Sequence, residues 1–269
     1  MPARTYPHGV PCWIDLTQPD IDAAARFYGA LFGWRFQDVV PSSAPGGYLV
    51  ATLDGEDVGA LARGDASDGW VSYIACDDAD TTAATVTRAG GRVIDAPQDA
   101  GTGGRAATCQ DAQGALFRLW QARQRLGAQA VNVPGAWNFS DLITPDPGEA
   151  MRFYGAVFGW QVNDDLGAGM IRLPGYGRHL AATSDPEILE SQAFAPEGFE
   201  DVIAGVSEGD GEARWSIRFT VADRDDTAAL AERLGATIAS SAETDWTREA
   251  VIVDPQGARF VTSQLVMPQ

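Results

Sequence analysis

The chain contains no lysine, because all 19 of its Lys+Arg residues are arginine. A lysine Schiff base, and with it pyridoxal-phosphate chemistry, is therefore excluded, as is a phosphate-binding loop ending in Gly-Lys-Ser/Thr. Histidine is nearly as scarce, with only His8 and His179, so one chain cannot build a metal site from several imidazoles. Three cysteines, Cys12, Cys76 and Cys109, are widely spaced without a Cys-x-x-Cys pair, which indicates reduced structural thiols.

Positive charge is also in short supply, since 37 Asp+Glu residues give a net charge of -18. A surface this acidic repels phosphate backbones, so we expect no nucleic-acid partner. No run of 18 apolar residues occurs, and the first residues lack the apolar segment of a signal peptide. We therefore expect no membrane partner and a cytoplasmic protein. The 269 residues, 45% of them hydrophobic, suit one large domain or two ordinary ones.

An internal repeat favours two domains over one large domain. Residues 26–34 read RFYGALFGW and residues 152–160 read RFYGAVFGW, so eight of nine letters match at an offset of 126. Later in the chain, the segment DAQGA beginning at Asp111 matches DPQGA beginning at Asp254, at an offset of 143. Matches this long, in the same order in both parts of the chain, indicate two homologous halves.

The repeat predicts the domain boundaries. We place the first domain at 1–122, a polar linker at 123–133 and the second domain at 134–269. The growing offset predicts an insertion in the second domain, which we place at 184–213. This segment is acidic and carries Pro and Gly, so it is interpreted either as a lid over a binding cleft or as a solvated loop.

Periodicity predicts a β-α-β-β-β module that occurs twice in each half. A strand at 12–17 alternates apolar and polar residues, and a helix at 20–32 begins at Asp20 and stops at Gly33. Strands are expected up to about 62, then a strand at 70–76, a helix at 78–89 and strands at 92–95, 105–110 and 115–121. The predicted fold class is α+β, built from four such modules.

This pattern resembles the vicinal oxygen chelate superfamily. The features that carry the resemblance are the strand, the following Asp, the FYxxxFGW sequence and the later DxxG before a final strand, in both halves. The superfamily includes glyoxalase I, extradiol dioxygenases and bleomycin-resistance proteins. The resemblance implies two tandem glyoxalase-like domains, in which paired modules curl their sheets around a ligand cleft. It specifies the fold and says little about chemistry.

Metal-using members of the superfamily carry ligands, often two His and a Glu, on the first strand of each module and on the last strand. Carried over by counting from the matched motifs, these positions fall on Trp13, Val71 and Arg118, and on Phe139, Ser216 and Val261. The remaining position lies near Leu61 in one half and near His179–Ala181 in the other. This set is a poor ligand set for a metal, so we expect neither a family-type metal site nor another cofactor.

Residues two positions apart on a strand share a face, so the same counting predicts the walls of the two clefts. In the first half the predicted ligand-binding residues are Trp13, Asp15, Val71, Tyr73, Arg118 and Trp120. In the second half they are Phe139, Asp141, Ser216, Arg218, Arg259 and Val261. Flat aromatic rings with fixed polar groups suit a planar, oxygenated small molecule. The alternative for Asp15 and Arg118 is a buried ion pair that closes the sheet.

The remaining aromatic and histidine residues have simpler interpretations. Trp34, Trp160, Trp70 and Trp215 are expected in the core. His179 is a candidate general base, with a structural role as the alternative.

Three functions are consistent with these features, and they are given in order of decreasing preference. The first is a metal-independent binding protein that holds an aromatic or polycyclic natural product, for antibiotic self-resistance or as an accessory in antibiotic biosynthesis, with a biosynthetic oxygenase as a further partner. The second is a metal-independent cyclase, isomerase or hydroxylase component, with Asp15, Asp141 or His179 as acid-base groups. The third is a metal-dependent lyase or dioxygenase. The chain is expected to be a monomer or a weak homodimer.

Overall fold

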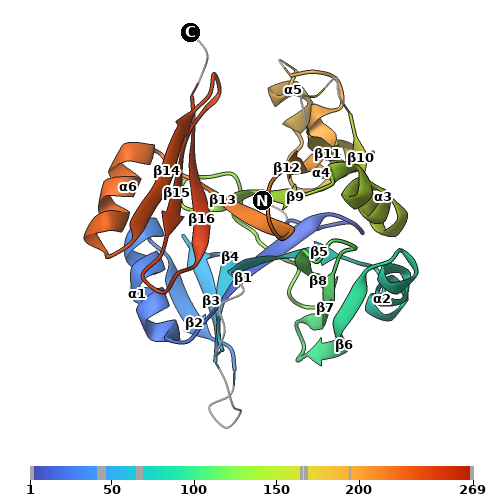
Figure 1. The fold of residues 1–269 in the computed structure, drawn as a ribbon, viewed down its shortest axis with the longest axis horizontal. Coiled ribbons are helices and arrows are strands. Elements are labelled where there is room, and N and C mark those ends of the chain that lie inside the picture. Colours follow the sequence, from blue (N-terminus) through green and yellow to red (C-terminus); the bar gives the residue numbers. More distant parts are fainter. Residues whose placement is uncertain are drawn as a thin grey trace. The chain divides into compact units, whose positions relative to one another are not determined.

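The computed structural model describes residues 3–40, 47–64, 69–163, 166, 169–193 and 195–266. It is a mixed α+β structure with two eight-stranded sheets, one from each half of the sequence (Figure 1). The strand orders are β2-β3-β4-β1-β5-β8-β7-β6 and β10-β11-β12-β9-β13-β16-β15-β14. The two orders are equivalent strand by strand, so the predicted fold class and the duplication are confirmed.

The first half follows the predicted β-α-β-β-β pattern twice. Its first module consists of β1 (Pro11–Gln18), α1 (Ile21–Phe32), β2 (Arg35–Asp38), β3 (Tyr48–Leu53) and β4 (Glu56–Arg63). Its second module consists of β5 (Trp70–Ala75), α2 (Ala79–Arg88), β6 (Arg92–Ala100), β7 (Gly104–Gln110) and β8 (Leu116–Ala122). The predicted linker at 123–133 carries neither helix nor strand.

The second half contains the same modules with additional helices. Its first module consists of β9 (Trp137–Thr144), α3 (Pro147–Phe158), β10 (Gln161–Val162), β11 (Met170–Arg172), α4 (Tyr176–Thr183), α5 (Ile188–Ser191), the 3₁₀ helix η2 (Phe199–Asp201) and β12 (Val202–Glu208). Its second module consists of β13 (Arg214–Thr220), α6 (Arg224–Arg233), β14 (Thr237–Glu243), β15 (Thr247–Val253) and β16 (Arg259–Leu265). The longest described helices have 12 residues, and none of those described could cross a membrane.

The position expected for the insertion, 184–213, needs correction. Strand β12 lies within this range and pairs with β9 as β4 pairs with β1, because Gly205 faces Asp141 where Ala60 faces Asp15. The additional residues of the second half are therefore the helices between β11 and β12. The sequence also placed a strand near His179–Ala181, and this is wrong, since His179 belongs to helix α4. The true counterpart of Leu61 is Val206, because these residues face Leu16 and Leu142 in equivalent registers.

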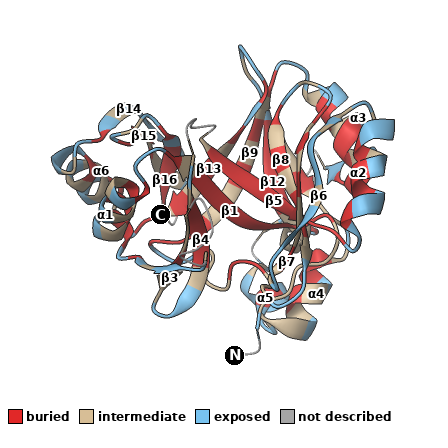
Figure 2. Cartoon of the chain, turned by 90° about the horizontal axis from the view of Figure 1, so that it is seen from below, coloured by how far each residue is buried: buried red, intermediate tan, exposed pale blue. Residues whose placement is uncertain are grey.

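Local sequence explains the first helix of each half. Asp20 caps α1 by accepting a hydrogen bond from the backbone N–H of Ala23, and Asp146 caps α3 by the same contact with Glu149. Each helix ends at a glycine in the left-handed conformation, Gly33 at φ +77° and its counterpart 126 residues later. The Phe and Tyr residues of the repeated motif are buried (Figure 2).

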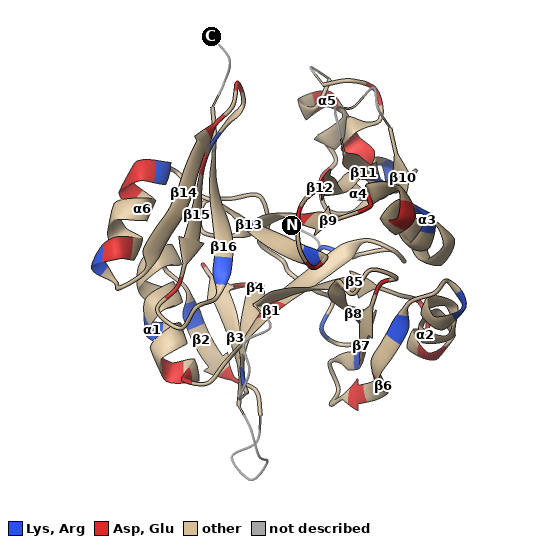
Figure 3. Cartoon of the chain, in the orientation of Figure 1, with Lys and Arg blue, Asp and Glu red and all other residues tan. Residues whose placement is uncertain are grey.

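The chain packs into two compact units, and each unit combines one module from each half. The α1–α6 unit comprises Ile14–Val71, Ala128–Phe139 and Ser216–Gln269. The α2–α3 unit comprises Met1–Trp13, Ser72–Gly127 and Ser140–Trp215. Figure 3 shows acidic residues on helices of both units, including α6 and α3.

Each unit has an aromatic core built around the repeated motif. In the α1–α6 unit the ring of Tyr28 packs against those of Trp34, Trp70 and Phe260. The α2–α3 unit contains the equivalent cluster of Tyr154, Trp160, Trp215 and Phe117. All four tryptophans expected in the core are at most 8% exposed, which confirms that prediction.

Candidate ligand-binding faces

The two faces of each strand are distinguished by what the side chains contact. In the α1–α6 unit, Nε1 of Trp70 donates to the hydroxyl of Tyr28 on α1 at 3.2 Å. Gln18 on β1 donates to Asp254, which also accepts from Tyr28. Trp70 and Gln18 therefore face the helix, and by alternation Val71 and Asp15 occupy the opposite face. We call this opposite side of each strand the helix-free face.

The α2–α3 unit shows the same alternation. Nε1 of Trp215 donates to the hydroxyl of Tyr154 on α3 at 3.1 Å, and the ring of Phe117 packs against Phe153 of the same helix. Arg118 and Trp120, one and three positions after Phe117, therefore lie on the helix-free face of β8.

All twelve predicted ligand-binding residues occupy strand positions that alternate onto the helix-free face. The α2–α3 unit contains Trp13, Tyr73, Arg118, Trp120 and Asp141, and the α1–α6 unit contains Asp15, Val71, Phe139, Ser216, Arg218, Arg259 and Val261. The first group is largely buried, whereas Arg259 is exposed. That these residues bind a ligand remains a prediction, as does the ion pair suggested for Asp15 and Arg118.

Tyr73, Arg118 and Trp120 come together on neighbouring strands. Tyr73 on β5 faces Arg118 on β8 in parallel register, and Nη1 of Arg118 donates to the Tyr73 hydroxyl at 3.0 Å. The guanidinium carbon lies 5.3 Å from the centre of the Tyr73 ring, and the rings of Tyr73 and Trp120 meet edge to face at 6.2 Å. Nε1 of Trp120 donates to the carbonyl of Arg125. This arrangement holds an arginine against the Tyr73 ring, which itself packs against Trp120.

The second half presents a different arrangement on β13, β15 and β16. Arg218 faces Val261 in register and forms an ion pair with Glu249, whose side chain is 19% exposed. Glu249 was missed in the sequence, because the counting followed only the first and last strands of each module. The alternation of Glu249 with buried Ala250 and Ile252 could have placed it on the helix-free face.

The three candidate acid-base residues have different environments. Asp15 is 1% exposed and Asp141 is half-buried, both on helix-free faces. His179 lies on α4, where its Nε2 is 3.0 Å from Oγ1 and 3.1 Å from the backbone oxygen of Thr5. These contacts attach the N-terminal segment to α4, so they support the structural role for His179.

The cysteine thiols are poor nucleophiles in this fold. Burial raises the pKa of Cys76 and that of Cys109 to about 12, and burial raises the pKa of Cys12 well above its ordinary value. All three are free thiols within the interior. Because the thiolate is the reactive form, these residues act as small apolar core residues.

The side chains at the family's metal-ligand positions do not fit a divalent metal. Four are apolar (Trp13, Val71, Phe139 and Val261), and Arg118 presents only donors, which leaves Ser216 as the sole oxygen. The corrected positions, Leu61 and Val206, are aliphatic as well. Across the described ranges, no three His, Cys, Asp or Glu side chains are grouped so that they could hold an ion.

Comparison with known protein families gives two matches in tandem. Residues 12–119 match the model of the glyoxalase/bleomycin resistance protein/dioxygenase superfamily, and residues 125–262 match that of a glyoxalase-like domain.

Two relatives match along nearly the whole chain. The proposed glyoxylase CFP32 of Mycobacterium tuberculosis is 36% identical over 97% of this chain and 97% of its own. The anthracycline biosynthesis protein DnrV of Streptomyces peucetius is 33% identical over 96% of this chain and 94% of its own.

Solved structures share the fold at low sequence identity. The Mn(II)-bound glyoxalase from Novosphingobium aromaticivorans matches with a TM-score of 0.61 and 17% identity, covering 96% of this chain and 82% of its own. The 2,3-dioxygenase LapB from Pseudomonas sp. KL28 matches with a TM-score of 0.62 and 13% identity, covering 97% and 95%. At this identity the likeness concerns the fold alone.

Proposed function

Because this chain belongs to the glyoxalase/bleomycin resistance protein/dioxygenase superfamily, we propose that it binds a small molecule on its helix-free strand faces. The proposed ligand is an aromatic or polycyclic natural product, held without a metal. The protein then serves antibiotic self-resistance or acts as an accessory in antibiotic biosynthesis, in the cytoplasm and in some pathways beside an oxygenase.

The observation that carries this proposal is the cluster of Tyr73, Arg118 and Trp120. An aromatic ligand gains from stacking and from the apolar area it buries, and the guanidinium can donate to a phenol or quinone oxygen. The hydrogen bond to Tyr73 restrains the arginine before the ligand arrives, which lowers the entropy lost on binding. The relative DnrV, named as an anthracycline biosynthesis protein, supports a polycyclic aromatic ligand.

A binding experiment with matched tryptophan variants tests the proposal. Isothermal titration calorimetry with hydroxylated anthraquinones should give saturable binding, and Trp13→Ala and Trp120→Ala should each weaken it about tenfold, the loss of one stacking contact. Trp246→Ala is the control, because Trp246 is 50% exposed at the turn before β15. Equal affinity in all four proteins, or no binding at all, would contradict the proposal.

A metal-independent enzyme using the same faces is the second candidate. The half-buried Asp141 on a helix-free face favours it, since such a carboxylate can move a proton. Conversion of the bound molecule in the presence of a chelator, lost in Asp141→Asn, would favour this candidate over simple binding.

A further inference from the structure

Glu249 is a carboxylate held in place through one of its two oxygens. Oε1 pairs with Nη1 of Arg218, accepts from Oγ1 of Thr247 at 3.1 Å and from Oγ of Ser263 at 3.5 Å. Glu249 and Ser263 face each other directly across β15 and β16, so both side chains lie on the helix-free face of the α1–α6 unit. Three donors on one oxygen fix the direction of the carboxylate plane.

The second oxygen of Glu249 is available. Oε2 forms no hydrogen bond with any residue in the described part of the chain, and it does not belong to the buried polar atoms that lack a partner. The acceptor is therefore accessible on a face that is otherwise half-buried. A fixed, partly desolvated acceptor makes a stronger hydrogen bond than a mobile surface carboxylate.

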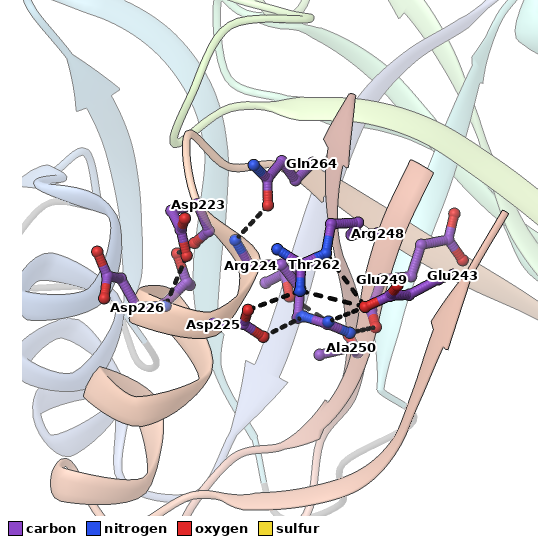
Figure 4. Close-up of polar contacts among 11 residues, drawn as sticks. Asp223, Arg224, Asp225, Asp226, Glu243, Arg248, Glu249, Ala250, Thr262 and Gln264 are labelled. Atoms are coloured by element: carbon purple, nitrogen blue, oxygen red, sulfur yellow. Dashed lines mark hydrogen bonds and ion pairs between the residues drawn. The ribbon is translucent and has the colours of Figure 1, made fainter. Parts of the chain in front are cut away.

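The strand below this carboxylate is restrained from the helix side. Nη1 of Arg224, at the start of α6, donates to the backbone oxygen of Glu249 at 2.9 Å, and Nη2 donates to Glu243 at 2.8 Å (Figure 4). Arg224 is only 5% exposed. Its contacts therefore hold the backbone at Glu249 on the helix side while Arg218 holds the side chain on the opposite face.

The first half carries no equivalent acceptor. The offset of 143 aligns Glu249 with Ala106 and Ser263 with Trp120, and these two residues also face each other, across β7 and β8. The first half thus places a large aromatic ring at the position where the second half places a polar pair. The duplication has diverged toward two different binding chemistries on equivalent strands.

We propose that Glu249, together with Thr247 and Ser263, forms a hydroxyl-binding subsite on the helix-free face of the second half. Because Glu249 already pairs with Arg218, the subsite takes a neutral donor, such as a phenol on a polycyclic aromatic ligand, in preference to a cation. The inference rests on the proposed function, and it assigns to one carboxylate the selection of hydroxylated ligands.

A pair of probes that differ in one hydroxyl group tests this subsite. Isothermal titration calorimetry compares 2-hydroxyanthraquinone with its O-methyl ether, which cannot donate. The native protein should bind the hydroxyl form about tenfold more tightly, since the ether leaves a desolvated carboxylate oxygen without a donor. Glu249→Gln should reduce this ratio to about twofold. Glu243→Gln is the matched control, because Glu243 is exposed and lies on the helix side, and it should leave the ratio unchanged.

The outcomes separate this inference from the proposed function. Equal binding of both probes by the native protein, or a ratio that persists in Glu249→Gln, would overturn the subsite and leave aromatic binding intact. Absence of binding by either probe would overturn both. Thr247→Val keeps the shape of the side chain while removing one donor to Oε1, so it should lower the ratio by a smaller factor in a protein with native thermal stability.

Discussion

The hydroxyl group of Tyr28 donates a hydrogen bond to Oδ2 of Asp254, an acceptor 2.9 Å away and 226 residues later in the sequence. In the other unit, the hydroxyl of Tyr154 donates to Oδ2 of Asp111 at 3.2 Å. Both pairs join the FYG motif of one half to the DxxG turn of the other. Since each unit takes one module from each half, the two halves stabilise each other reciprocally.

The glutamine of each DxxG turn adds further hydrogen bonds between the two halves. The side chain of Gln256 donates to the backbone oxygen of Asp20 and accepts from its N–H, at 2.9 and 3.0 Å. Gln113 forms the same two bonds with Asp146, at 2.7 and 3.0 Å. The turn of one half therefore holds the helix cap of the other, which gives the repeated glutamine a structural role.

Removal of the two tyrosine hydroxyls should have unequal effects. Tyr154→Phe takes away the only donor to Oδ2 of Asp111 among the described residues, whereas after Tyr28→Phe Gln18 still donates to Asp254 at 3.0 Å. We expect a loss of about 2–3 kcal/mol in the free energy of unfolding for Tyr154→Phe and about 1 kcal/mol for Tyr28→Phe. Urea denaturation of both variants measures the difference, and equal losses would contradict the asymmetry.

The buried carboxyl of Asp111 should make stability depend on pH in an unusual direction. Burial raises the pKa of Asp111 above its ordinary value of 3.8. The folded protein therefore takes up this proton at a higher pH than the unfolded chain does, and the carboxylate destabilises the fold above its folded pKa. As pH falls from 7 toward about 4, this penalty is relieved.

The isosteric variant Asp111→Asn isolates this effect, because all other titrating groups are shared with the native protein. The free energy of unfolding of the native protein, measured relative to the variant, should rise as pH falls over that range. A difference that stays constant with pH, or decreases, would show that Asp111 titrates as an ordinary carboxyl.

A glycine in each unit allows a tryptophan to reach a backbone oxygen. Nε1 of Trp34 donates to the carbonyl of Gly135 at 2.7 Å, where Gly135 adopts φ +86° and an added Cβ would lie 2.9 Å from the oxygen of Phe32. Gly135→Ala should therefore cost about 2–3 kcal/mol of folding stability. Gly55→Ala is the control, because Gly55 has a similar φ of +91° with open space around it, and it should cost about 1 kcal/mol. Thermal unfolding compares the two.

The sequence predicted the modules well because helix caps and alternation are local signals. Asp20, Gly33 and the 12–17 strand are found as expected. The sequence also indicated which candidate ligand residues share one face of a strand, because this needs only one correctly aligned position on each strand. The pairing of Tyr28 with Asp254 could not be predicted, because a repeat does not reveal which module packs against which.

The errors in the second half have a similar cause. Few letters match between Trp160 and Trp215, so the inserted helices could not be separated from strand β12. For this reason His179, which belongs to helix α4, was predicted to lie on a strand. Glu249 was missed because it lies on β15, which is neither a first nor a last strand of its module, and because its partner Arg218 is 31 residues away on another strand.

Arg224 should contribute more to stability than its neighbour Arg248, although both join Glu243 and Asp225 (Figure 4). The Arg224 side chain is 6% exposed and also donates to the backbone oxygen of Glu249, whereas the Arg248 side chain is 32% exposed. Arg224→Met should lower the free energy of unfolding by about 2–3 kcal/mol, because a part-buried carbonyl loses its donor and a buried guanidinium loses its ion pairs. Arg248→Met should change it by about 0.5 kcal/mol or less, as for other exposed ion pairs.

Urea denaturation at low and high salt checks both values. Raised salt should reduce the small effect of Arg248→Met and leave most of that of Arg224→Met, since screening acts on exposed charges.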